Sequence, residues 1–74
     1  MNFENLEYIY YLLKEDVDRK HQSFLSSDSA FQDAEDAGVV GARLDTIKRE
    51  RDEARDAYWK ARDVLDSFSR KEWN

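Results

Sequence analysis

The sequence predicts an all-α protein in which two long helices form an antiparallel hairpin. Apolar residues recur at alternating steps of three and four in both halves of the chain, which is the spacing of a coiled-coil seam. The segment between the two halves holds the only two glycines, and proline is absent. A chain rich in helix-forming residues and nearly free of helix breakers is typical of long helices.

The first helix is expected to span about residues 3–37. Asn2 is a suitable N-cap, and Glu4 would lie near the positive end of the helix dipole. Lys20 and Ser27 occupy two polar positions in an otherwise apolar series. The apolar positions of this predicted seam are Phe3, Leu6, Tyr10, Leu13, Val17, Phe24, Phe31 and Ala34.

A kink or break is expected near residues 26–29, where the sequence reads Ser-Ser-Asp-Ser. Serine and aspartate compete for backbone hydrogen bonds and favour caps over helix interiors. An alternative geometry places the main turn here, followed by one helix from about residue 29 to 73. That helix would contain both glycines in its interior, at a cost of about 1 kcal/mol each. We therefore favour a turn at about residues 38–41, with Gly38 as the helix C-cap.

The second helix is expected to span about residues 42–73. Arg51 holds the one polar position of its seam, and Ala54 and Ala61 are small enough to let the helices approach closely. Residues 1–74 would thus form a single helical-hairpin domain. The apolar positions of this half are Leu44, Ile47, Ala54, Tyr58, Ala61, Leu65 and Phe68.

Composition limits how stable such a hairpin can be. Chains of this length seldom gain more than about 3–5 kcal/mol from one core, and the 74 residues include no cysteine for a disulfide or thiolate metal site. A second hairpin would supply more apolar contact, so we expect dimerisation into a four-helix bundle.

Several apolar residues lie off the seam, and a two-helix contact does not require them. Exposed together, they would form the kind of patch that marks an interface, either with a second copy or with a different protein. The candidate interface residues are Tyr8, Ile9, Tyr11, Leu12, Trp59, Val64 and Trp73.

Acidic residues gather around the predicted turn. Clustered carboxylates can imitate nucleic-acid phosphates, so an acidic nucleic-acid mimic or phage-type inhibitor of host defence is an alternative function, although such residues also serve simply to solvate a turn. The candidate acidic patch comprises Asp28, Asp33, Glu35, Asp36 and Asp45.

Charge disfavours nucleic acid as a partner. Residues 1–41 carry nine acids and three bases, a sum of −6, whereas residues 42–74 carry eight acids and nine bases, a sum of +1. The total of −5 opposes contact with phosphates. A dimeric hairpin that binds RNA or DNA through the basic residues of its second helix remains an alternative function.

The sequence offers little for catalysis. It has one histidine, His21, which lies three residues after Asp18 and so shares a helix face with it, but one such pair is too few for a metal centre. We predict a non-enzymatic protein without catalytic residues, cofactor or metal. No apolar run approaches the length of a membrane span, and no secretion signal opens the chain, so a cytoplasmic protein is expected.

The predicted function is that of a small protein–protein interaction module. It would serve as an adaptor, assembly factor or inhibitor, acting by occlusion or bridging through aromatic anchors.

Overall fold

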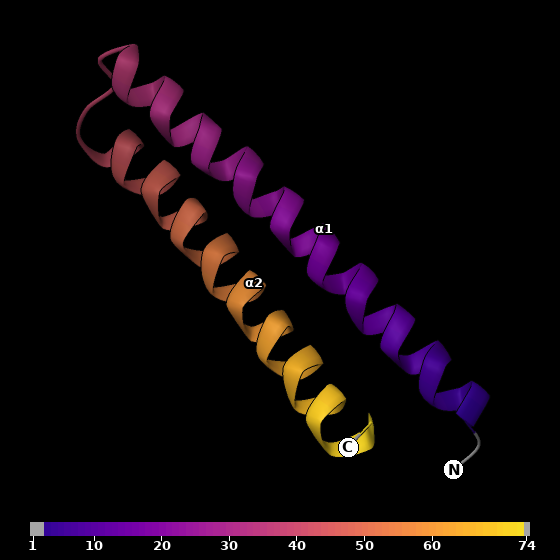
Figure 1. Ribbon diagram of the computed structural model, residues 1–74. Coiled ribbons are helices and arrows are strands. Elements are labelled where there is room, and N and C mark those ends of the chain that lie inside the picture. The colour runs from indigo at the N-terminus through magenta and orange to yellow at the C-terminus, as the bar shows by residue number, and fades with distance from the viewer. Residues whose placement is uncertain (1–2, 74) are drawn as a thin grey trace.

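The computed structural model describes the backbone of residues 3–73 and the side chains of residues 5–70. Two helices, α1 (Phe3–Asp36) and α2 (Ala42–Trp73), pack against each other along their length and form a narrow rod (Figure 1). The Cα atoms extend over 54 × 14 × 13 Å. The prediction of an all-α antiparallel hairpin is confirmed, and the described residues include no strand.

The reversal of direction is made by a helix cap built on Gly38. Its φ of 79° lies in the left-handed region, which glycine adopts at no steric cost. The backbone N–H of Gly38 donates to the Glu35 carbonyl at 3.0 Å, and that of Val39 donates to the Ala34 carbonyl at 2.9 Å. This pair of bonds is the Schellman motif, which satisfies the last carbonyls of a helix.

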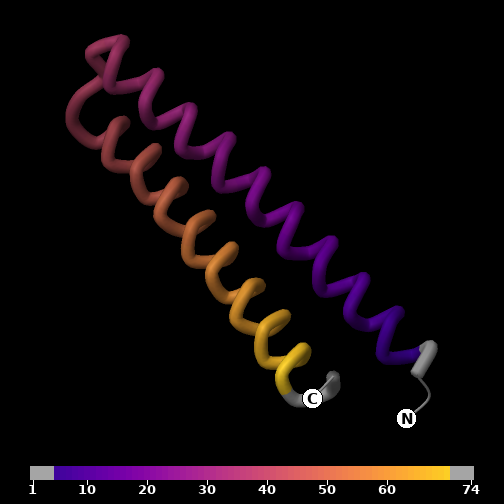
Figure 2. The backbone as a smooth tube through the Cα atoms, viewed as in Figure 1, coloured from indigo at the N-terminus to yellow at the C-terminus, as the bar shows by residue number. Residues whose placement is uncertain are grey.

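Gly41 starts the second arm. Its φ is 76°, and its carbonyl accepts a 3.0 Å hydrogen bond from the Asp45 N–H, the first bond of α2. The chain therefore turns back within a few residues, and Figure 2 shows the coloured parts of the two arms lying side by side.

The break expected at residues 26–29 is wrong, and so is the alternative turn there, because α1 is helical throughout this segment. Asp28 accepts a hydrogen bond from the Gln32 side chain at 3.1 Å, a spacing of four residues that supports the helix. Phe24, Ser27 and Phe31 keep their places on the side facing α2 and are all partly buried. Packing along the seam outweighs the local preference of serine and aspartate for caps.

Every predicted seam position with a described side chain is at least partly buried, including the polar residues Lys20, Ser27 and Arg51. Only Ala34 and Ala61 fall to 8% and 9% exposure, because small side chains let the two backbones approach closely. Within the described part of the chain, neither helix has a stretch apolar enough to cross a membrane.

Candidate protein-interaction surfaces

The seam between the helices is open to solvent along its length. Among the described residues no large side chain is fully buried, and the chain exposes 5666 Å². A compact monomeric protein of 8.8 kDa exposes about 4,800 Å². The hairpin thus exposes roughly 900 Å² more than a compact protein of its mass.

The seam divides the rod surface into two sides. A helix turns about 100° per residue, so a residue just before a seam position and one just after it lie on opposite sides of the seam. Val64 precedes the seam residue Leu65, whereas Trp59 follows the seam residue Tyr58. We call the side of Val64 the groove side and the side of Trp59 the aromatic side.

The aromatic side is built around Tyr58, whose ring contacts both helices. The His21 ring stacks on it with centroids 4.8 Å apart, and the Phe24 ring lies nearly parallel to it at 6.3 Å. Trp59 tilts against Tyr58 at 5.6 Å. The result is an array of rings that crosses from α1 to α2 and reaches solvent at Trp59, which is exposed.

Arg62 covers the exposed end of this array. Its guanidinium carbon lies 4.9 Å from the Trp59 ring centroid and 5.7 Å from that of Tyr58, within the range of cation–π attraction. Arg62 forms no ion pair among the described side chains, so its donors are available to a carboxylate from outside. We call His21, Phe24, Tyr58, Trp59 and Arg62 the aromatic cluster.

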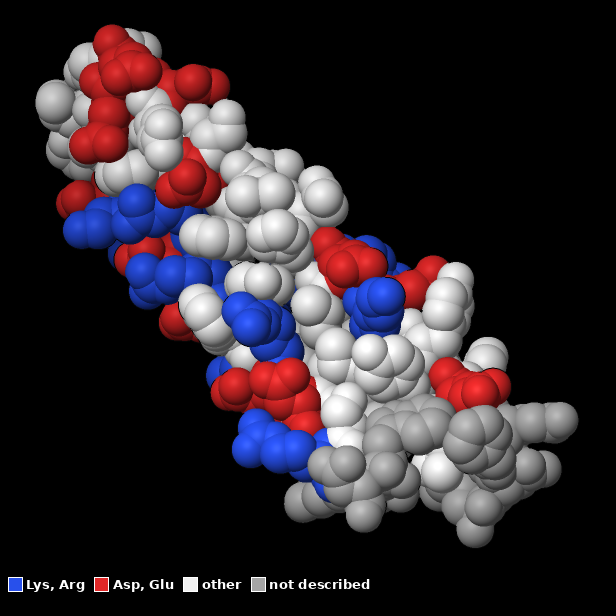
Figure 3. All heavy atoms as spheres, in the orientation of Figure 1, with Lys and Arg blue, Asp and Glu red and all other residues white. Residues whose placement is uncertain are grey.

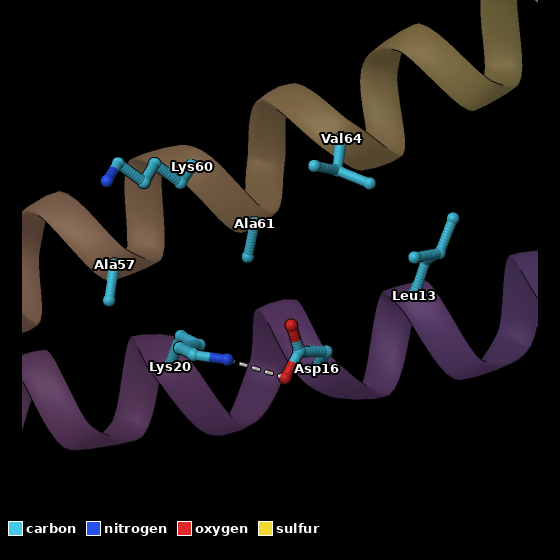
Figure 4. A pocket seen from close by; sticks show the side chains of 7 residues that line it. All are labelled: Leu13, Asp16, Lys20, Ala57, Lys60, Ala61 and Val64. Carbon is cyan, nitrogen blue, oxygen red and sulfur yellow. Dashed lines mark hydrogen bonds and ion pairs between the residues drawn. The ribbon is translucent and has the colours of Figure 1, made fainter.

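The groove side carries a shallow hollow of about 280 Å³. In Figure 4, Leu13 lies opposite Val64, and Ala61 points toward α1 from between Ala57 and Val64. Asp16 and Lys20 form the polar part of the α1 side of this hollow and are joined by a 2.7 Å ion pair. We call this feature the groove; its lining residues are Leu13, Asp16, Lys20, Ala57, Lys60, Ala61 and Val64.

The predicted interface residues do not form one patch. Ile9 and Leu12 precede seam residues and share the groove side with Val64, whereas Tyr11 follows a seam residue and shares the aromatic side with Trp59. Tyr8 falls between the two sides and points away from the seam. Trp73 lies outside the described side chains.

Tyr11 is tied to its own helix. Its hydroxyl donates to the Glu15 carboxylate at 3.0 Å. That hydrogen bond raises the pKa of Tyr11 above its usual value, because ionisation would remove the donor. Sequence reasoning named Trp59 as an interface residue but did not place His21 beside Tyr58 or Arg62 beside Trp59. Arg62 follows Trp59 by three residues and Tyr58 by four, and this spacing could have shown that the three side chains share one helix face.

The predicted acidic residues lie at and near the turn. Asp33, Glu35, Asp36 and Asp45 are exposed, whereas Asp28 is partly buried and accepts the Gln32 hydrogen bond. Figure 3 shows acidic side chains gathered over the turn end of the rod and basic side chains along α2.

The basic residues of α2 are interleaved with acids. Arg51 donates to Asp52 through Nε at 3.2 Å and through a terminal nitrogen at 3.0 Å, and Arg55 lies 3.8 Å from the same carboxylate. The hydrogen bond from Arg51, offset in part by burial, lowers the pKa of Asp52 below its usual value. Arg51 also covers the Phe31 ring at 4.3 Å, which explains how a charged residue occupies the seam.

His21, the one histidine of the chain, stacks its ring on that of Tyr58. The described residues contain no group of three or more potential ligands. Comparison of the chain with protein-family models, curated proteins and solved structures found no match.

Proposed function

We propose that this protein is a non-enzymatic protein–protein interaction module that binds another protein through the aromatic cluster and a second copy of itself through further apolar surface. It would act as an adaptor, assembly factor or inhibitor, bridging or occluding surfaces with a rigid rod. The observation that carries this proposal is the open seam, which leaves roughly 900 Å² more surface exposed than a compact protein of this mass.

The composition of the aromatic cluster supports a binding role. Tryptophan, tyrosine and arginine dominate the residues that contribute most to protein–protein affinity. Tyr58, Trp59 and Arg62 lie within about one helical turn, with the Trp59 ring tilted against that of Tyr58 and the Arg62 guanidinium over both rings. Because these side chains already hold each other in place, binding would restrict few additional rotations.

The charges around the cluster set the kind of partner. Among the described side chains Arg62 has no ion-pair partner, and its guanidinium lies beside the exposed indole ring of Trp59. A matching surface would place an apolar residue against Trp59 and a carboxylate against Arg62, as a bidentate ion pair. We expect an apolar patch with an acidic neighbour on the partner protein.

Truncating Trp59 tests this proposal. Tagged wild-type protein and Trp59→Ala would be used to capture partners from extracts of the cells that make the protein. Loss of a central aromatic anchor should weaken binding roughly thirtyfold. Binding constants would be measured with the purified partner by isothermal titration calorimetry.

The control is Val40→Ser, which removes an apolar side chain that is 77% exposed at the turn, far from the aromatic cluster. This variant should bind as wild type does. Equal binding by wild type and Trp59→Ala would contradict the proposal. A ligand lost steeply between 50 and 200 mM salt would indicate phosphate contacts and favour the nucleic-acid alternative.

A further inference from the structure

We propose that the groove binds the groove of a second copy of this chain, so that two hairpins pair side by side as a four-helix bundle. The inference rests on the proposed function, because it assigns one of the two apolar sides to self-association. It leaves the aromatic cluster free for a different protein.

The exposed area matches what a dimer covers. The hairpin exposes roughly 900 Å² more than a compact monomer of its mass. Each partner in a standard protein–protein interface buries about 800 Å². Covering one side of the rod with a second rod would therefore bring the exposed surface to that of an ordinary folded protein.

The position of the groove favours a second copy over a shorter partner. Its lining residues span 13–20 of α1 and 57–64 of α2, near the middle of both helices. A twofold axis perpendicular to the rod, passing through a contact at its middle, lets two identical rods overlap over nearly their whole length. The same contact at one end would leave most of each rod uncovered.

The chemistry of the groove suits close helix packing. Ala57 and Ala61 present only methyl groups, while Leu13 and Val64 supply apolar bulk on either side (Figure 4). Small residues beside large ones let facing helices interdigitate. The dimer need not bury an unpaired charge, because Asp16 and Lys20 already pair at 2.7 Å.

Lys60 is the remaining charge in the groove and is exposed. Its long apolar stem allows the ammonium group to reach solvent at the edge of an interface.

Sedimentation equilibrium tests the proposal. Wild-type protein should have twice the 8.8 kDa chain mass at micromolar concentration. Val64→Asp, which places a carboxylate among the apolar side chains of the groove, should raise the dimer dissociation constant at least about a hundredfold. Val40→Asp, the same substitution at the exposed turn, should remain a dimer, and so should Trp59→Ala.

A second measurement does not depend on how well Val64→Asp folds. A photo-crosslinking residue would replace either Leu12 on the groove side or Leu25 on the aromatic side, which are 44% and 46% exposed. Irradiation of each pure protein should give a covalent dimer at least about fivefold more efficiently from position 12 than from position 25, since only position 12 borders the proposed interface.

Three results would overturn the inference: a monomeric wild type at 100 µM, a Val64→Asp protein that stays dimeric, or preferential crosslinking from position 25. A monomeric wild type would leave the groove to another protein. If Trp59→Ala still binds the captured partner as wild type does, the proposed function of the aromatic cluster is wrong, but dimerisation through the groove is unaffected. The two proposals can therefore fail separately.

Discussion

Replacing Tyr58 with alanine should destabilise the protein by about 2–3 kcal/mol, since large aromatic-to-alanine changes cost about 3–5 kcal/mol in closed cores and this ring is only partly buried. The variant loses the stack with His21, the contact with Phe24 and the support beneath Trp59. A hairpin of this size has about 3–5 kcal/mol in total from its core. The variant should therefore retain at most about 3 kcal/mol of this stability and unfold at a much lower urea concentration than wild type.

Urea denaturation followed by far-UV circular dichroism measures this effect, with all variants at one chain concentration because dimerisation would otherwise shift the midpoint. The matched control is Tyr8→Ala, since Tyr8 is 64% exposed on α1 and points away from α2. Exposed substitutions usually change stability by less than about 0.5 kcal/mol. Equal losses for the two variants would show that Tyr58 does not join the helices.

Replacing Gly38 with valine should cost about 1–2 kcal/mol or more, because a residue with a Cβ is strained in the left-handed region and a β-branched one especially so. Gly38 has a φ of 79°, and a Cβ placed there would meet no heavy atom within 4 Å. The penalty is thus conformational, without a clash against neighbouring atoms. The midpoint of urea unfolding should fall accordingly.

Gly38→Asn is the matched variant, since asparagine is the other residue that commonly occupies this position of a helix cap. It should lose clearly less stability than Gly38→Val. If the asparagine and valine variants unfold at the same urea concentration, the turn does not depend on a left-handed residue at position 38, and the Schellman geometry is wrong.

The hairpin could be predicted because the information for it is local and periodic. Seam residues such as Leu13 and Tyr58 recur with a spacing that fixes which stripe of each helix is apolar. The two glycines mark where the direction reverses, and both adopt positive φ. Period and turn chemistry are properties that a single sequence shows directly.

The break near residues 26–29 was mispredicted because the preference of serine and aspartate for helix caps was considered without the helix packing that opposes it. Ser26 and Ser29 are poor residues for a helix interior, but Ser27 between them is a partly buried seam position. Most helical stability in a protein comes from such tertiary contact. The spacing of the seam positions continues without interruption from Phe24 to Phe31, and this periodicity was the better indicator of a continuous helix.

The division of the apolar surface into two sides was also missed. Trp59 and Val64 were grouped because both lie off the seam, yet one follows a seam residue and the other precedes one. The stacking of His21 on Tyr58 depends on the register between the helices and on side-chain orientation, which the periodicity of one helix does not determine.

The central claim is that the chain folds back at residues 38–41, and a distance between spin labels tests it most directly. Because the chain has no cysteine, Lys14→Cys and Asp66→Cys can be labelled specifically. Both positions are exposed and lie on the same side of the seam. Dilution with unlabelled chains restricts the measurement to pairs within one molecule.

The hairpin predicts a separation on the order of 20 Å, given the 8–10 Å between packed helices and the reach of two labels. One uninterrupted helix would place the labels about 78 Å apart, and a turn at residues 26–29 would place them about 35–40 Å apart. Either longer distance would contradict the fold, and with it the groove and the aromatic cluster.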